Sequence, residues 1–185
     1  MKIVPIFELP NTKLLTVKYD GQELDALETI QGQWSSTEFL REFFGKFKDD
    51  YYAKYGRSKL NTLVEQAKQL ADKLFEKLYE LAEDEETDAL AKFFKPLDNR
   101  ELASELYELQ KLKAREEKRK SYLRIYAIRY KEKIIITGGA IKLTDRMEVR
   151  PHTKDTKDEL NKLELVKSFL DKNNPEVTFS YIDVN

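Results

Sequence analysis

The chain has 185 residues, of which 41% are hydrophobic and 36% are charged, and its net charge is -1. A chain of this length and composition buries a real core, which predicts a single globular domain over residues 1–185 and argues against disorder. Cysteine is absent, which excludes disulfides, thiolate zinc sites and cysteine nucleophiles, and a single histidine, His152, excludes histidine-rich metal sites.

The small net charge hides an uneven distribution. Residues 111–154 hold fourteen Lys/Arg and five Asp/Glu, a net charge of +9, so the remainder of the chain carries -10. This asymmetry favours an anionic partner such as RNA, although residues 111–120 are equally typical of a solvated helix end. No apolar run approaches the roughly 20 residues that span a bilayer, and Pro5 and Glu8 interrupt the start of the chain, so we expect a cytoplasmic protein without membrane contact.

The first expected elements are two strands over residues 3–7 and 14–19, rich in β-branched and apolar residues. Pro5 suits an edge strand because proline cannot donate a hydrogen bond to a sheet. The pattern then predicts a short helix over residues 23–30, which Gly32 ends.

The middle of the chain, residues 22–120, is expected to be mainly helical. The sequence Ser-Ser-Thr-Glu at residues 35–38 matches a capping box, and phenylalanines follow at helical spacing. We interpret this aromatic stripe as core and not as a stacking platform for bases, because its spacing is that of a core-facing helix. The acidic run at 83–86 is interpreted as a solvated junction and not as a cation site. Helices are expected over residues 35–56, 58–81, 88–94 and 98–112.

Residues 121–144 carry the densest strand signal and are expected to form a central hairpin. Strand alternation places Leu123, Ile125 and Ala127 on one face of the sheet and Arg124, Tyr126, Ile128 and Tyr130 on the other. The β-branched run 134–137 suits a strand buried on both faces. Gly138 and Gly139 are expected to end the ladder, through positive φ or close approach of another backbone, before a third short strand over residues 140–144.

Thr156 and Glu159 match another capping box, which predicts a last amphipathic helix, and a final strand is expected over residues 177–182. The predicted fold class is therefore α+β. An antiparallel, bent sheet of N-terminal strands, late hairpin and C-terminal strand packs against the helical middle.

The late strands also carry a family resemblance. Residues 123–129 and the sequence Gly-Gly-Ala-Ile-Lys at 138–142 resemble a group of uncharacterised bacterial proteins associated with RelE/HigB-like toxins of type II toxin-antitoxin systems. The similarity extends through residues 94–97, 152–153 and 159–163, and so covers roughly residues 90–170. It implies a RelE-like sheet with a helical insertion, since the chain is about twice the usual toxin length.

The resemblance implies cleavage of messenger RNA, free or on the ribosome, and neutralisation by an adjacent helix-turn-helix antitoxin. Such cleavage needs a base for the ribose 2′-hydroxyl, cations for the phosphorane and an acid for the leaving oxygen. The candidate catalytic residues are Arg124, Lys142 and His152. The candidate nucleic-acid-binding residues are Tyr126, Arg129, Arg146 and Arg150. The sequence contains no motif for a metal, nucleotide or other cofactor, so the expected nuclease is metal-independent.

Each candidate also has a purely structural interpretation. Arg124 and Arg129 are also compatible with ordinary surface or salt-bridged positions, Tyr126 with the core, and His152 with a loop. Two further functions therefore stay open beside the nuclease. One is a non-catalytic protein that binds nucleic acid or the ribosome, and the other is a protein-interaction module.

Overall fold

The α+β class is confirmed by the computed structural model of the chain. The structure describes residues 1–6, 13–84, 89–96, 122–130, 132–143, 153–173 and 180–183. The predicted helix over residues 98–112, the basic run at 111–120 and most of the segment between the hairpin and the last helix lie outside these residues.

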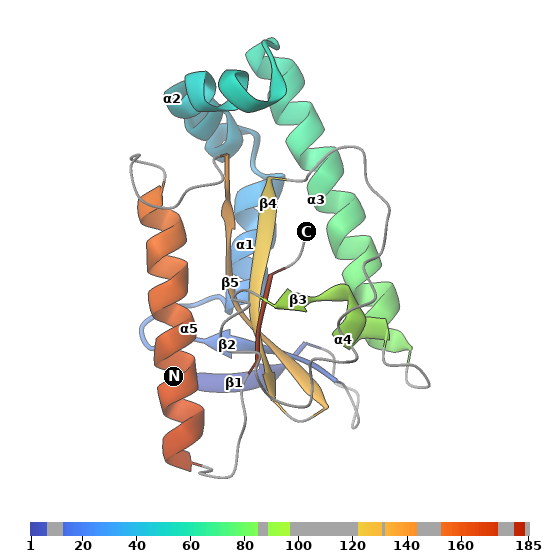
Figure 1. Cartoon of the computed structure of the whole chain (residues 1–185), viewed down its shortest axis with the longest axis vertical. Coiled ribbons are helices and arrows are strands. Elements are labelled where there is room, and N and C mark those ends of the chain that lie inside the picture. Colours follow the sequence, from blue (N-terminus) through green and yellow to red (C-terminus); the bar gives the residue numbers. More distant parts are fainter. Residues whose placement is uncertain are drawn as a thin grey trace.

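Within the described residues, six strands form one mixed sheet in the order β1-β2-β5-β4-β6-β3 (Figure 1). Both predicted N-terminal strands, the hairpin and a C-terminal strand are present in it. The strands are β1 (Lys2–Pro5), β2 (Leu14–Lys18), β3 (Lys95–Pro96), β4 (Leu123–Tyr130), β5 (Lys133–Ile141) and β6 (Ser180–Asp183).

The expectation of an antiparallel sheet is only partly right, because β2 and β5 run parallel, with Leu14 opposite Ile134 and Thr16 opposite Ile136. The other neighbouring pairs are antiparallel. Between β2 and β5 the described residues form four helices, β3 and β4. Such a long connection permits β5 to pair parallel with β2.

The four described helices between β2 and β5 differ from the predicted ones mainly at their ends. The first, α1, continues through Gly32 and is capped by Asp25, whose carboxylate accepts from two backbone N–H groups while Glu28 closes a capping box. The predicted break at Gly32 is therefore wrong. The second begins after Ser36, which caps it through Phe39 N–H. The helices are α1 (Ala26–Ser35), α2 (Thr37–Tyr55), α3 (Leu60–Glu83) and the short α4 (Ala89–Phe93).

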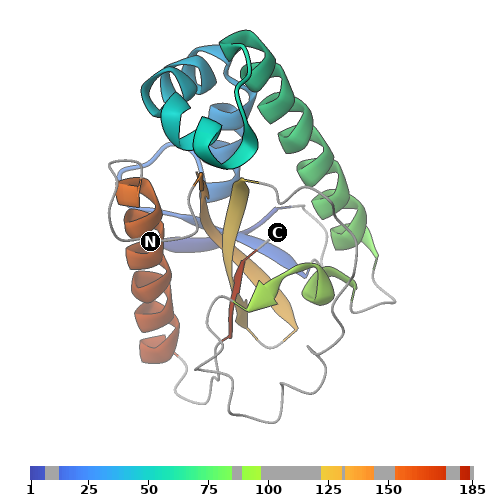
Figure 2. The same cartoon turned by 45° about the horizontal axis from the view of Figure 1, so that its top comes forward.

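The last helix, α5 (Thr153–Asn173), begins three residues before the predicted cap at Thr156, so that assignment is wrong. The helix covers one face of the sheet, while α1, α2 and α3 lie on the other (Figures 1 and 2). Two buried clusters result, one on each face. Leu123, Ile125 and Ala127 belong to the first, and Tyr126 and Ile128 to the second, as strand alternation predicts. The run Ile134–Ile136 is buried on both faces, also as predicted.

The ladder does not end at the two glycines, so β5 is one strand where the sequence predicts two. A bulge absorbs the irregularity, because Tyr126 pairs with Gly138 while Ala127 pairs with Ile136, which leaves Thr137 as the extra residue. Neither Gly138 nor Gly139 has a positive φ. The close approach is real, since a Cβ added at Gly139 would lie 2.8 Å from the Arg124 carbonyl oxygen.

Candidate functional site

The candidate site lies where β2 and β5 separate. The described residues of β2 pair with β5 only as far as Ile136, so β5 continues from Thr137 to Ile141 without a described strand on this side. The helix that follows β2 packs on one face of the sheet, and the described helix that follows β5 packs on the other. Adjacent parallel strands with helices on opposite faces form a crevice beyond their carboxyl ends, which is where open α/β sheets bind ligands.

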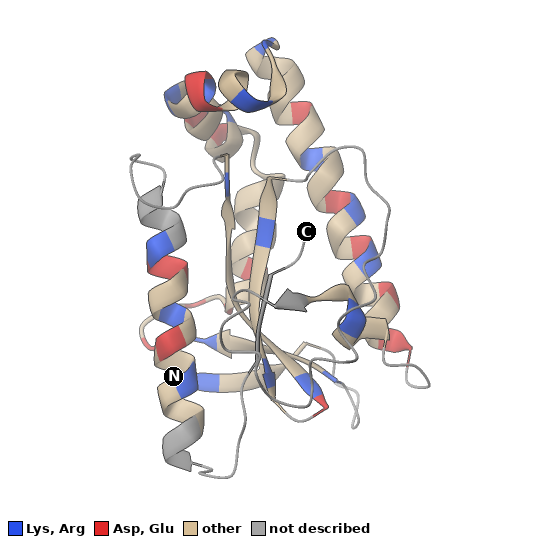
Figure 3. Cartoon of the chain, viewed as in Figure 1, with Lys and Arg blue, Asp and Glu red and all other residues tan. Residues whose placement is uncertain are grey.

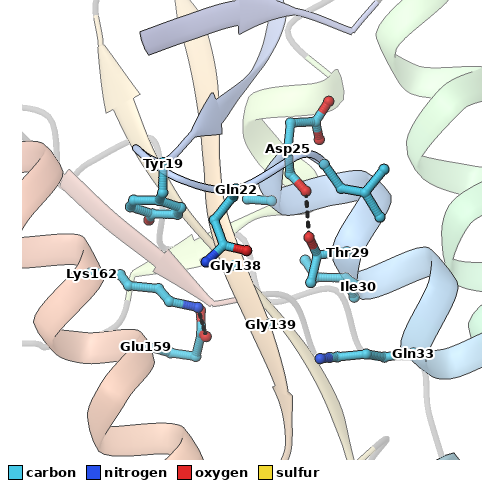
Figure 4. A pocket seen from close by; sticks show the side chains of 12 residues that line it. Tyr19, Gln22, Asp25, Thr29, Ile30, Gln33, Gly138, Gly139, Glu159 and Lys162 are labelled. Atoms are coloured by element: carbon cyan, nitrogen blue, oxygen red, sulfur yellow. Dashed lines mark hydrogen bonds and ion pairs between the residues drawn. The ribbon is translucent and has the colours of Figure 1, made fainter. Parts of the chain in front are cut away.

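A cavity of about 350 Å³ occupies this crevice (Figure 4). Its walls are the turn after β2, one side of α1 from Ala26 to Gln33, the glycines of β5 and the first half of α5. In Figure 4 the amide side chain of Gln22 enters from the turn after β2 and that of Gln33 from α1, while Glu159 and Lys162 face them from α5. Polar groups from three separate elements thus converge at a side-chain-free stretch of strand.

Glu159 is the most buried acidic residue of this crevice, with 6% of its surface exposed. Its carboxylate lies against Gly138, where an added Cβ would overlap it, and accepts a hydrogen bond from Lys162 one helical turn later. Burial of a charge is costly unless the charge is paired, and Lys162 supplies that pairing. The absence of a side chain at Gly138 therefore leaves room for the Glu159 carboxylate, and its φ is not positive.

Tyr19 closes the same end of the crevice. Its hydroxyl donates to the Thr137 carbonyl oxygen at 2.7 Å, which satisfies the bulged residue, and Lys162 Nζ lies 5.6 Å from the centre of its ring. Burial, with the nearby Glu159 carboxylate as the smaller cause, raises the pKa of the Tyr19 phenol above its ordinary value. The phenol is a neutral structural donor at physiological pH.

A second cavity of about 320 Å³ continues the first along β5. The two share Gln33, Gly139, Glu159 and Lys162. The second cavity is apolar on the helix α1 and α2 side, where Trp34, Phe39 and Phe43 line it, and acidic on the α5 side, where Asp158 joins Glu159. The two cavities together form a trough along residues 138–141, with an apolar wall on the α1 and α2 side and an acidic wall on the α5 side.

Two of the predicted catalytic residues, Arg124 and Lys142, are brought to one face of the hairpin. Arg124 pairs with Ala140, and the Lys142 N–H donates to the Tyr122 carbonyl oxygen at 2.7 Å, which extends the ladder by one more pair. Diagonal neighbours of this kind have Cα atoms about 7–8 Å apart. Both residues are half-buried, on the sheet face that α5 covers.

Two of the predicted nucleic-acid-binding residues do not join this pair. Tyr126 is 2% exposed and packs in the core beneath α5, and a ring buried to this extent offers no face to a base. Arg129 lies near the far end of β4, and alternation turns it to the opposite face from Arg124. Figure 3 shows the corresponding pattern, with few charged residues on the hairpin and mixed charges along α3 and α5.

His152, Arg146 and Arg150 lie outside the described residues, so their assignments stay predictions. Among the described residues, no three His, Asp or Glu side chains are grouped so that they could hold a metal ion. No helix in the described parts of the chain is both long and apolar enough to cross a membrane.

The residue patterns of the sequence do not predict the crevice or the residues that line it. The sequence predicts Glu159 as the reciprocal partner of a helix cap, whereas it lies inside α5 and faces the sheet. A usable signal existed, because a glycine pair within a strand pattern indicates a close approach by another group. The sequence does not reveal which side chain makes that approach, since the partner is 21 residues away along the chain.

Comparison with protein-family models, curated proteins and solved structures gives no match for this chain.

Proposed function

We propose that the chain is a toxin-like endoribonuclease of the RelE/HigB type, which cleaves messenger RNA in the cytoplasm and is neutralised by a helix-turn-helix antitoxin. The observation that carries the proposal is the placement of Arg124 and Lys142 as diagonal neighbours on one face of the hairpin. The resemblance of residues 122–142 to the toxin-associated group supplies the reaction.

The roles follow from the charge that develops during cleavage. Arg124 and Lys142 contact the scissile phosphate and stabilise the phosphorane, whose additional negative charge two neighbouring cations match better than one. His152 acts as general acid or base, since its ordinary pKa is the closest to neutrality of any side chain here. Arg146 and Arg150 bind flanking phosphates. Arg129 contacts RNA only if the RNA chain extends around the hairpin to the sheet face opposite Arg124.

The test is tightly induced expression of the wild type beside Arg124→Ala and Lys142→Ala, with growth and total-RNA integrity followed. Lys133→Ala is the matched control, because it removes the same charge from an exposed position at the opposite end of β5. We expect arrest and RNA cleavage with the wild type and the control, and at least about a 100-fold slower cleavage with either site variant. Circular dichroism and Trp34 fluorescence verify that each purified variant is folded.

Two outcomes contradict the proposal. One is intact RNA and normal growth with soluble, folded wild type, and the other is undiminished cleavage by both site variants. If purified wild type binds RNA without cleaving it, and the affinity falls steeply with salt, the protein is instead a non-catalytic RNA- or ribosome-binding protein.

A further inference from the structure

The trough beside β5 contains strand backbone whose hydrogen-bonding groups face the crevice. The Lys142 N–H points to β4, because it donates to Tyr122. Successive residues of a strand turn their backbone groups to opposite edges, so Gly139 and Ile141 point away from β4. The Tyr19 hydrogen bond to the Thr137 carbonyl oxygen agrees with this assignment, since Thr137 has the same parity and faces the same side.

Gly139 and Ile141, whose backbone groups point away from β4, form a short strand edge to which a partner could bind. Each carries one N–H donor and one C=O acceptor, and within the described residues no strand pairs with β5 on this side after Ile136. Unpaired strand edges are templates for another strand. The two cavities lie between α1 and α5 along residues 138–141 of β5. Four strand residues span about 13 Å at roughly 3.3 Å per residue.

We propose that this trough binds an extended peptide segment of a partner protein, which adds a strand to the open edge of β5 between α1 and α5. The glycines leave their stretch of β5 without side chains of its own, and Ile30 and Glu159 from the two helices occupy the space beside them. The proposal is independent of RNA cleavage, which we assign to the Arg124 face of the hairpin.

The walls define the side chains of that segment. Neighbouring residues of an added strand point to opposite walls. The α1 and α2 wall is apolar, with half-buried Phe39 beside the buried Trp34 and Phe43. The α5 wall has exposed Asp158 next to buried Glu159, which accepts a hydrogen bond from Lys162. The α5 wall has a net negative charge, so a segment that alternates apolar with Lys or Arg residues fits both walls by polarity and by charge.

The probe is the acetylated and amidated hexapeptide Val-Lys-Val-Lys-Val-Lys, titrated against the full chain. Trp34 is the sole tryptophan of the chain and lines the second cavity, so its fluorescence reports occupancy. The decisive comparison is the same peptide with alternate backbone nitrogens methylated, in both possible phases. Methylation leaves every side chain in place but removes the donors that a strand needs, and we expect one of the two phases to weaken binding at least tenfold.

Asp158→Asn tests the acidic wall, with Asp72→Asn on the exposed side of α3 as matched control. We expect Asp158→Asn to weaken the lysine peptide about threefold, as one exposed ion pair does, and Asp72→Asn to leave it unchanged. Binding that neither methylated peptide weakens would overturn strand addition. Absence of binding by folded protein at millimolar peptide would overturn the docking site itself, whatever the ribonuclease assay gives.

Discussion

The hydroxyl groups of half-buried Tyr19 and buried Tyr122 have different hydrogen-bonding environments. Tyr19 donates to the bulged Thr137 carbonyl, whereas the hydroxyl of Tyr122 has no hydrogen-bond partner among the described residues. Burial is the main cause that raises the pKa of both phenols above the ordinary value, with the neighbouring Tyr51 and Tyr55 as smaller causes at Tyr122. Sequence reasoning left both roles unassigned, because burial of a tyrosine depends on contacts that a pattern does not encode.

We predict that Tyr19→Phe lowers the free energy of unfolding at pH 7 by about 1 kcal/mol, since it leaves a carbonyl without its donor. Tyr122→Phe should leave stability unchanged or raise it by about 1 kcal/mol, since it removes a buried hydroxyl that lacks a partner. Urea unfolding followed by circular dichroism measures both. A loss at Tyr122→Phe as large as that at Tyr19→Phe would contradict this account.

The same two variants have a pH signature. A raised native pKa means that the folded protein keeps a proton that the unfolded chain releases near pH 10. The resulting stabilisation is fully present below pH 10 and declines as the pH rises toward the native pKa. In each variant, the free energy of unfolding should therefore fall less steeply with pH above pH 10 than in the wild type.

The strand β5 shows what periodicity predicts and what it does not at the scale of one element. Residue type predicts the buried run Ile134–Ile136 and a short strand after the glycines. It does not predict that both belong to one strand with a bulge at Thr137. A glycine pair permits a break or a close approach equally well, and only the contacts of Gly138 and Gly139 decide. Gly32 in α1 is a similar case. Glycine has a low helix propensity, but the capping box and the burial of Ile30 and Trp34 outweigh that cost.

We predict unequal costs for alanine at the two glycines. At Gly139 the added methyl would meet the Arg124 carbonyl at 2.8 Å, and backbone of a central strand cannot move away, so we expect a loss of about 2–3 kcal/mol. At Gly138 it would meet the end of the Glu159 side chain, which can rotate, so the loss should be about 1 kcal/mol.

Gly45→Ala is the control for these variants. Gly45 lies in α2 with nothing near the added methyl, so helix propensity should raise stability by up to about 1 kcal/mol. Equal losses at Gly138 and Gly139, measured by urea unfolding, would argue against the packing described for β5.

At the scale of the whole molecule, one sheet is shared by two cores. The fold class, both N-terminal strands and most helices follow from residue patterns, because each depends on local periodicity. The parallel pairing of β2 with β5 and the crevice beside it do not, because they depend on where a chain returns after a long crossover. The sequence predicts Arg124 and Lys142 separately as catalytic candidates, but it predicts neither their placement as diagonal neighbours on the hairpin nor the α5 side of the crevice.

Shared use of the sheet predicts coupled unfolding of the two faces. Leu163, on the sheet-facing side of α5, is 1% exposed, and Leu163→Ala should cost about 2–5 kcal/mol. Trp34 lies on the opposite face, yet its fluorescence transition should shift with the circular dichroism transition, since single domains unfold cooperatively. Leu165→Ala, at a position 54% exposed, should shift neither transition. A Trp34 transition that stays in place while the helix signal moves would show that the faces unfold separately.

The pairing of Leu14 with Ile134 also sets the order of events on the ribosome. The N-terminal strand pair is made early, but its neighbour in the sheet is synthesised 120 residues later, which takes roughly 6 to 24 seconds at common translation rates. During that interval the apolar stripes of α1, α2 and α3 have no sheet to cover. Nascent chains of this protein should therefore depend on chaperones until the hairpin emerges, and should misfold most readily when translation pauses between α3 and β4.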